Sequence, residues 1–299
     1  MIRIRPFILT TIVLSFGLSS IAAQSREIEH KTVFLEEGRF AGWPANQGIW
    51  SWGDEIVVGL TLGYYKKDPD GGHAIDPDRP KTLRQARSLD GGETWEIEKP
   101  GYLNEEGKES DPVQLKESID FSNPDIALKF RSDKFYYSPD RCHSWEGPFQ
   151  LPDFGREELL ARTDYLIEGE NRVTAFISAS KEETDDEGQP LCIRTTDGGK
   201  SWDLIGWIGD QPPIGYGYAI MPSTVKLKSG AYLSMIRRAG VFDGDSRRWI
   251  EAFLSPDEGA SWYLLKEPHI ENYGNPASMV RLADDRIALT YGYRRAPQG

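Results

Sequence analysis

One eight-residue motif occurs four times in the 299-residue chain and restricts its possible folds more than any other feature. The motif reads Ser/Thr-x-Asp-x-Gly-x-Ser/Thr-Trp, and we call each copy a repeat turn. The four copies occupy residues 88–95, 138–145, 195–202 and 255–262. Their aspartates are 50, 57 and 60 residues apart: Asp90, Asp140, Asp197 and Asp257. Spacing of this size is typical of one structural unit repeated along a chain.

The residue types of the motif predict a tight turn between two β-strands. Aspartate, serine and threonine side chains bond to backbone N–H groups inside such turns, and glycine takes the positive φ that they require. The tryptophan buries a large ring and anchors the strand that follows. Since the second copy has Cys142 in place of the glycine, we expect its turn to be distorted.

A second pattern runs in phase with the first. Similar strand starts occur at residues 123–130, 221–227 and 275–282. Segments 231–237 and 286–293 alternate partly between apolar and polar residues, as half-buried strands do. A four-stranded unit with its loops takes roughly 40 to 50 residues. We therefore predict an all-β protein with one repeat turn in each unit.

The repeat turns resemble the Asp-boxes of the sialidase (neuraminidase) superfamily. The resemblance covers almost all of residues 24–299 and implies an all-β, six-bladed β-propeller. After Trp262 the chain finishes one unit and starts another, and it stops before the next repeat turn. We therefore expect a propeller that is truncated in its fifth blade.

The N-terminus has the composition of a secretion signal. Arg3 and Arg5 precede an apolar run over residues 7–21, and the small residues Ala22 and Ala23 follow it. This run is shorter than the roughly 20 apolar residues of a membrane span. We predict a signal peptide over residues 1–23, a secreted or periplasmic protein, and no membrane span after cleavage.

Charge and motif content exclude several classes of ligand. A net charge of −12 disfavours nucleic acid, although a local arginine cluster can still bind an anionic sugar. The sequence has no phosphate loop, dinucleotide fingerprint or zinc-ligand cluster, so we expect neither a metal nor a cofactor. Export would permit a disulfide between Cys142 and Cys192, and two separate buried thiols fit equally well.

The family resemblance implies three arginines that bind a substrate carboxylate, a tyrosine nucleophile assisted by glutamate, and an aspartate acid/base. Arg39 is the candidate for the first arginine, and Arg237 or Arg238 for the second. Arg294 or Arg295 occupies the equivalent place one unit later and is the candidate for the third. Arginine suits this role because its planar guanidinium binds a carboxylate through two parallel hydrogen bonds. The nucleophile is not located.

The acid/base is expected in the polar loop between Arg39 and the first repeat turn. Asp76 and His73 are its candidates, because both carry titratable groups there. Asn46 and Asp125 are candidates for substrate binding. Further residues on or beside the expected inner strands are candidates for the lining of a central funnel: Trp43, Trp50, Trp52, Asn123, Arg162, Asp164, Tyr218 and Asn275.

Three functions remain open at this point. The first is an exported glycoside hydrolase of the exo-α-sialidase type, acting on terminal sialic acid or a related acidic sugar. The second is a polysaccharide lyase or another glycosidase that acts on uronic-acid glycans. The third is a binding scaffold without catalysis, because fold alone does not determine function.

Overall fold

The computed structural model describes residues 29–67, 73–242 and 244–292. The described residues from Thr32 onward form one compact unit. The predicted signal peptide and Arg294 lie outside the described residues. Within those residues the chain is almost entirely β, with one short helix, α1 (Pro44–Gln47). No described helix has the length and apolar character that crossing a membrane requires.

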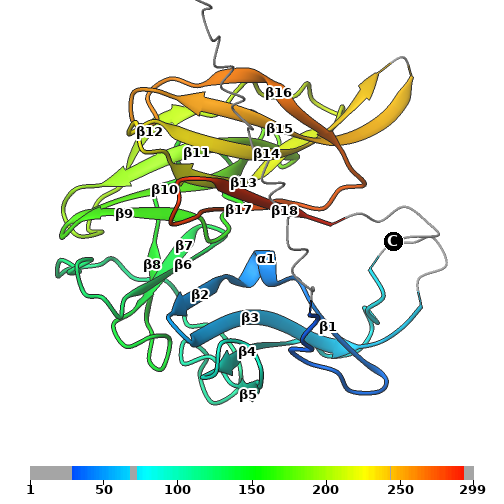
Figure 1. Ribbon diagram of the computed structural model, residues 1–299, viewed down its shortest axis with the longest axis vertical. Helices are drawn as coiled ribbons and strands as arrows, with labels where there is room; N and C mark the ends of the chain where they lie inside the picture. The colour runs from blue at the N-terminus through cyan, green and yellow to red at the C-terminus, as the bar shows by residue number, and fades with distance from the viewer. Residues whose placement is uncertain (1–28, 68–72, 243, 293–299) are drawn as a thin grey trace, which may run out of the picture. The chain divides into compact units, whose positions relative to one another are not determined.

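The strands form four blades and one smaller sheet (Figure 1). Blade 1 contains β1 (Arg39–Gly42), β2 (Ile49–Trp52), β3 (Glu55–Tyr64), β4 (Thr82–Ser88) and β5 (Glu96–Glu98). Blade 2 contains β6 (Ala127–Arg131), β7 (Lys134–Ser138) and β8 (Glu146–Gln150). Blade 3 contains β9 (Tyr165–Gly169), β10 (Arg172–Ser180), β11 (Glu187–Thr195) and β12 (Asp203–Trp207). Blade 4 contains β13 (Tyr218–Lys226), β14 (Tyr232–Phe242), β15 (Asp245–Ser255) and β16 (Tyr263–Glu271).

The smaller sheet is the hairpin of β17 (Ala277–Arg281) and β18 (Ile287–Tyr291). The prediction of an all-β propeller is confirmed, but the prediction of six blades is corrected to four. The physical reason is the length of each unit. At 50 to 60 residues between repeat turns, four blades take up the chain from Arg39 to Glu271.

The four repeat turns share one hydrogen-bond pattern. In the first turn the Asp90 carboxylate accepts from the Thr94 backbone N–H (2.9 Å) and from the Thr94 hydroxyl (2.6 Å). The Ser88 hydroxyl accepts from the Gly92 N–H at 2.8 Å. These bonds from Thr94 hold the pKa of Asp90 down to about 2. Equivalent bonds occur in the other three turns.

The predicted distortion of the second turn is wrong. Cys142 adopts φ of +67°, close to the positive φ of the glycines in the other turns, and its N–H bonds to the Ser138 hydroxyl at 2.8 Å. Cys142 and Cys192 are both buried free thiols, so they do not pair with each other. The two thiols therefore serve as small core side chains.

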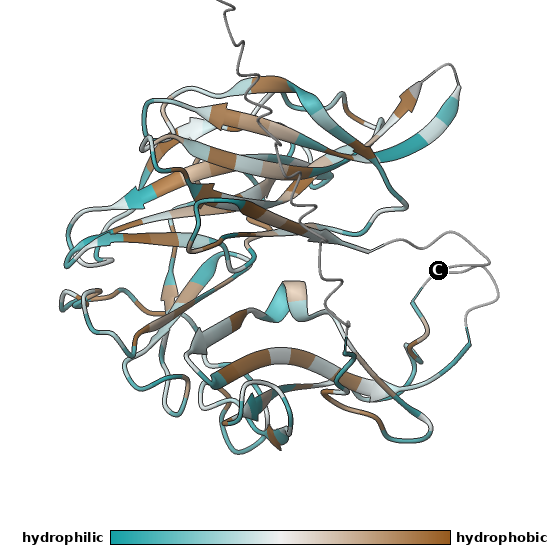
Figure 2. Ribbon diagram, viewed as in Figure 1, coloured by the Kyte–Doolittle hydropathy of each residue, from teal (hydrophilic) through white to brown (hydrophobic). Residues whose placement is uncertain are grey.

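The tryptophans of the second, third and fourth repeat turns pack in the core between blades, whereas Trp95 of the first turn packs within blade 1. The Trp145 ring of blade 2 meets the Trp50 ring of blade 1 at 5.4 Å, and the Trp202 ring of blade 3 meets Phe130 of blade 2 at 5.5 Å. Figure 2 shows the hydrophobic residues along the strands and the hydrophilic residues mainly in the loops. The largest buried cluster joins blades 2 and 3. Adjacent blades are thus held by aromatic contacts that the repeat itself supplies.

Candidate functional site

Two cavities lie where the inner strands of the blades approach one another, and α1 separates them. The cavity that we call central has a volume of about 660 Å³, and the one that we call lateral has about 690 Å³. Pro44, Ala45 and Gly48 line the central cavity, whereas Asn46 and Gln47 line the lateral one. Arg162 lines both cavities and therefore connects them.

The helix α1 interrupts the inner edge of blade 1. Both β1 and β2 pair with β3, and α1 bulges out between them. A Cβ on Gly59 of β3 would come within 2.6 Å of Gln47, so only glycine lets the helix lie this close. The buried Lys129 ammonium of β6 donates to the Gln47 carbonyl at 2.7 Å. Burial lowers the pKa of Lys129 to about 7. The sequence thus holds α1 firmly between the two cavities.

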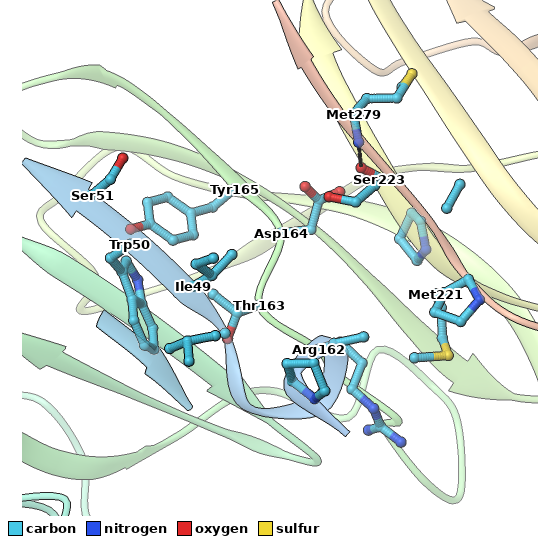
Figure 3. Close-up of a pocket in the computed structure, with 18 of the residues that line it drawn as sticks. Ile49, Trp50, Ser51, Arg162, Thr163, Asp164, Tyr165, Met221, Ser223 and Met279 are labelled. Carbon is cyan, nitrogen blue, oxygen red and sulfur yellow. Dashed lines mark hydrogen bonds between the residues drawn. The ribbon is translucent and has the colours of Figure 1, made fainter. Parts of the chain in front are cut away.

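The central cavity is lined by segments from blades 1, 3 and 4 and by β17. Figure 3 shows Trp50, Asp164 and Ser223 among its lining side chains. The lining is mostly apolar, with a few polar groups among the rings and methionines. Its members include Ile49, Trp50, Ser51, Trp52, Ile126, Arg162, Thr163, Asp164, Tyr165, Met221, Ser223, Ser278 and Met279. A cavity of this size and composition is typical of a small-ligand site.

Among the described residues that line the central cavity, Asp164 has the one carboxyl side chain. Burial raises the pKa of Asp164 to about 8, although the Thr224 backbone and hydroxyl donate to it and oppose the shift. Its Oδ2 is buried and has no hydrogen-bond partner among the described residues. Such a carboxyl carries a proton near neutral pH and can give it to a bound ligand.

Tyr165 lies next to Asp164 but its hydroxyl is engaged. The Leu128 backbone N–H donates to the Tyr165 hydroxyl at 3.2 Å, and the Trp50 indole donates to the Leu128 carbonyl at 3.1 Å. Burial raises the pKa of Tyr165 to about 12. The phenol is therefore neutral at physiological pH, and it helps to join blade 3 to blade 2.

Arg162 and Arg237 bring two positive charges to the same region. Arg162 donates to the Asn46 side chain at 2.9 Å and to the Ala161 carbonyl at 3.0 Å. Burial lowers the pKa of Arg162, the charge of Glu187 opposes this shift, and the charges of Arg131 and Arg237 add to it. Arg237 is not among the described lining residues of either cavity, but its guanidinium donates at 3.4 Å to the sulfur of Met221, which lines the central cavity, and lies 4.6 Å from the centre of the Tyr218 ring.

Neither arginine contacts a carboxylate in the part of the chain that the structure describes. The Nε of Arg237 is buried and has no hydrogen-bond partner there. Two guanidinium groups that repel each other, and that have no carboxylate in direct contact, gain from an anion between or beside them. The arrangement can therefore bind a carboxylate, and it does so beside a protonated carboxyl group.

The structure brings together some of the sequence-predicted residues. Asn46 binds Arg162, and Arg237 lies near it, as described above. Arg238 points elsewhere, because it forms an ion pair with Glu251 at 3.0 Å and donates to the Asp210 carbonyl at 3.3 Å. Alternation along β14 thus distinguishes the two members of the arginine doublet. Trp50, Trp52 and Asp164 line the central cavity, and Trp43 lines the lateral one.

Other predicted residues lie away from the central cavity. Arg39 donates to the Gly63 carbonyl at 2.8 Å and is not among the described lining residues of either cavity. Asp125 accepts from Arg141 at 2.7 Å, beside the second repeat turn. Their assignment to substrate binding stays a prediction.

The two acid/base candidates have partners away from the central cavity. His73 accepts from the Trp43 indole at 3.2 Å, so it lies behind a residue of the lateral cavity. Asp76 is 3.4 Å from the Lys66 ammonium and accepts from the Asp78 N–H. Neither lines the described part of either cavity, and their catalytic role also stays a prediction.

Several site residues were not predicted as ligand contacts. Ser223 lies in a strand start that the repeat pattern had marked, so that pattern could have identified it. Glu109, Arg131 and Lys134 line the lateral cavity, where Arg131 and Glu109 form an ion pair at 3.1 Å. Glu109 belongs to an irregular segment with no repeat phase, and nothing in the sequence signals its position.

The fold and the cavities define a β-propeller protein with a candidate ligand site between its inner strands. No protein-family model and no curated protein matches the chain.

Solved structures do match it. A protein of unknown function from Dyadobacter fermentans is 20% identical, with a TM-score of 0.64, over 91% of this chain and 80% of that one. An endo-arabinase from Bacteroides thetaiotaomicron is 14% identical, with a TM-score of 0.51, over 83% and 88%. A point mutant of NanB sialidase from Streptococcus pneumoniae is 13% identical, with a TM-score of 0.53, over 87% and 58%. The likeness shows that the chain shares a propeller fold with glycoside hydrolases.

Proposed function

We propose that this protein is a carbohydrate-active enzyme that cleaves the glycosidic bond of an acidic sugar. The observation that carries the proposal is the combination of Asp164, whose pKa lies near 8, with the two arginines that lack carboxylate partners. The propeller fold of an endo-arabinase and a sialidase supports a glycan as the substrate.

Each group has a distinct role in this proposal. Arg162 and Arg237 bind the sugar carboxylate through charge-assisted hydrogen bonds. Protonated Asp164 acts as general acid and donates its proton to the glycosidic oxygen as the bond to the leaving group breaks. The anomeric carbon bonds to the oxygen of a water molecule, and the proton released by that water restores the Asp164 carboxyl. Trp50 and Trp52 offer apolar surface to the sugar ring. Terminal sialic acid is the first substrate to test, since it carries a carboxylate on the ring that is released.

The test uses purified protein with fluorogenic α-sialosides, β-glucuronides and α-arabinofuranosides. We expect release from one of the two acidic substrates. Asp164→Asn should lower kcat by about 10²- to 10⁴-fold, the range for loss of a general acid. Arg162→Ala should raise KM by about 10- to 100-fold, as expected for a charged hydrogen bond.

A matched control is Lys200→Ala. Lys200 is exposed in the third repeat turn and lines neither cavity. This variant should retain wild-type kcat and KM. Release from the neutral arabinoside alone would refute the acidic-sugar proposal, and no release from any substrate at high enzyme concentration would refute the hydrolase proposal.

Export is part of the same proposal and rests on residues 1–23 of the sequence. Expression of the full chain in a bacterial host should give a periplasmic or secreted product that starts near Gln24. N-terminal sequencing of that product is the measurement. An uncleaved chain that starts at Met1 in the cytosol would contradict export.

A further inference from the structure

The lateral cavity is positively charged although the protein as a whole is acidic. The net charge of the chain is −12. Five cationic side chains but two acidic ones occur among the described residues that line this cavity: Lys81, Lys108, Arg131, Lys134 and Arg162, with Glu109 and Asp111. A concave surface with such an excess attracts anions and holds them more strongly than an open surface does.

Internal ion pairs account for only part of this charge. Glu109 is 3.1 Å from Arg131 and also accepts from the Tyr136 hydroxyl at 2.8 Å. The Lys108 ammonium is 2.9 Å from Glu106. The charges of Arg131 and Lys108 are therefore compensated by neighbouring glutamates.

Three cations remain. Lys81, Lys134 and Arg162 have no ion pair with a described residue, and Asp111 is the one acidic lining group that is not itself in an ion pair. Lys134 is only partly exposed, which strengthens the interaction of its charge with a ligand. The three cations come from three separate segments around one cavity: Lys81 just before β4, Lys134 in β7 and Arg162 before β9.

Arg162 connects the positively charged lateral cavity with the central cavity. Arg162 lines both cavities, with the thin partition of α1 between them. A ligand that contacts Arg162 in the central cavity can therefore extend past α1. At about 690 Å³ the lateral cavity has the size of a small-ligand site in its own right.

We propose that the lateral cavity is a second anion subsite, in which Lys81 and Lys134 bind the carboxylate or sulfate of the sugar next to the one held at Arg162 and Arg237. The substrate class is then a glycan with acidic groups on neighbouring sugars. This inference rests on the proposed function and specifies its substrate.

The test is isothermal titration calorimetry on the Asp164→Asn variant of the full chain, so that no ligand is cleaved. The probes are galacturonic acid, digalacturonate and an unsaturated chondroitin sulfate disaccharide. We expect at least one of the two dianionic probes to bind 10-fold or more tightly than galacturonic acid. Tighter binding of digalacturonate would indicate that the second group is a carboxylate, and tighter binding of the chondroitin sulfate disaccharide would indicate a sulfate.

Variants on that background test the two lysines. In the double variant Lys81→Ala/Lys134→Ala, the ratio of dianion to monoanion affinity should fall to about one. Lys81→Glu alone should also lower this ratio. Lys200→Ala should keep the ratio. Circular dichroism and urea unfolding show whether each variant remains folded.

Three outcomes overturn the inference. If galacturonic acid and both dianions bind equally tightly, or if the lysine substitutions leave the affinity ratio unchanged, the second subsite is refuted and the proposed function stands. If none of the three probes binds, the second subsite is refuted as well, and release from the α-sialoside or the β-glucuronide then decides the proposed function separately.

Discussion

The raised pKa of Asp164 predicts how the stability of the folded protein depends on pH. The folded carboxyl has a pKa of about 8, against 3.8 for an unperturbed aspartate. Between these values the folded state binds one proton more than the unfolded state, so stability falls as pH rises. At about 1.4 kcal/mol per pH unit, raising the pH from 5 to 8 should cost on the order of 3 to 4 kcal/mol through this one group.

Asp164→Asn isolates this contribution, since asparagine has a similar shape and does not titrate. Urea unfolding at pH 5 and pH 8 gives the free energy of unfolding for the wild type and the variant. We expect the wild type to lose about 3 to 4 kcal/mol more than the variant between these pH values. Typical domains have only about 5 to 15 kcal/mol in total, so the effect is large.

Equal pH dependence in the two proteins would refute the reasoning. Asp164 would then be ionised in the folded state at neutral pH and could not act as general acid there. If the reasoning holds, the rate of the wild-type enzyme should also fall as the pH rises through the pKa of Asp164, because the acid loses its proton.

Three further predictions concern stability and the outer residues. Glu168→Gln should destabilise the protein by about 3 kcal/mol in urea unfolding, because Glu168 is bound by Lys226 at 2.6 Å and Tyr232 at 2.8 Å. These partners hold the pKa of Glu168 near 2, against 4.5 unperturbed, so its contribution is present above pH 4.5 and is lost as the pH falls towards 2. Asp197→Ala should cost about 1 to 2 kcal/mol in thermal or urea unfolding, since it removes two bonds from Ser201. Arg39→Ala should leave ligand affinity within about 2-fold by calorimetry, because Arg39 and the partners of its guanidinium, Gly63, Glu36 and Tyr64, line neither cavity. A loss of about 10-fold or more would show that Arg39 takes part in ligand binding.

The repeat turns were predictable because their structure is local. The Asp, Ser/Thr and Gly positions form hydrogen bonds within eight residues, so no distant contact is needed to recognise them. The error at Cys142 has a physical reason. A left-handed residue costs about 1 to 2 kcal/mol, and the side-chain bonds from Ser138 and Asp140 offset that strain.

The position of Arg39 was less predictable because a four-residue helix intervenes. The sequence indicates one inner strand near Arg39, but α1 divides it, and β2 rather than β1 lines the central cavity. Arg162 and Asp164 line the central cavity because both lie just before the inner strand β9, whereas Asn46, on α1, lines the lateral cavity. Their part in ligand binding stays a prediction. The lateral cavity depends on Glu109 and its irregular loop, whose course is set by tertiary contacts.

The division of the blade 1 edge by α1 also affects how the protein could change over evolution. Because β3 pairs with β1 and with β2 independently, the segment between them can lengthen or shorten while the sheet keeps its register. That segment is the wall between the two cavities, and its size sets the distance between the groups on either side. Insertions of one or two residues there offer a route to new ligand preferences, with the framework of the propeller left intact.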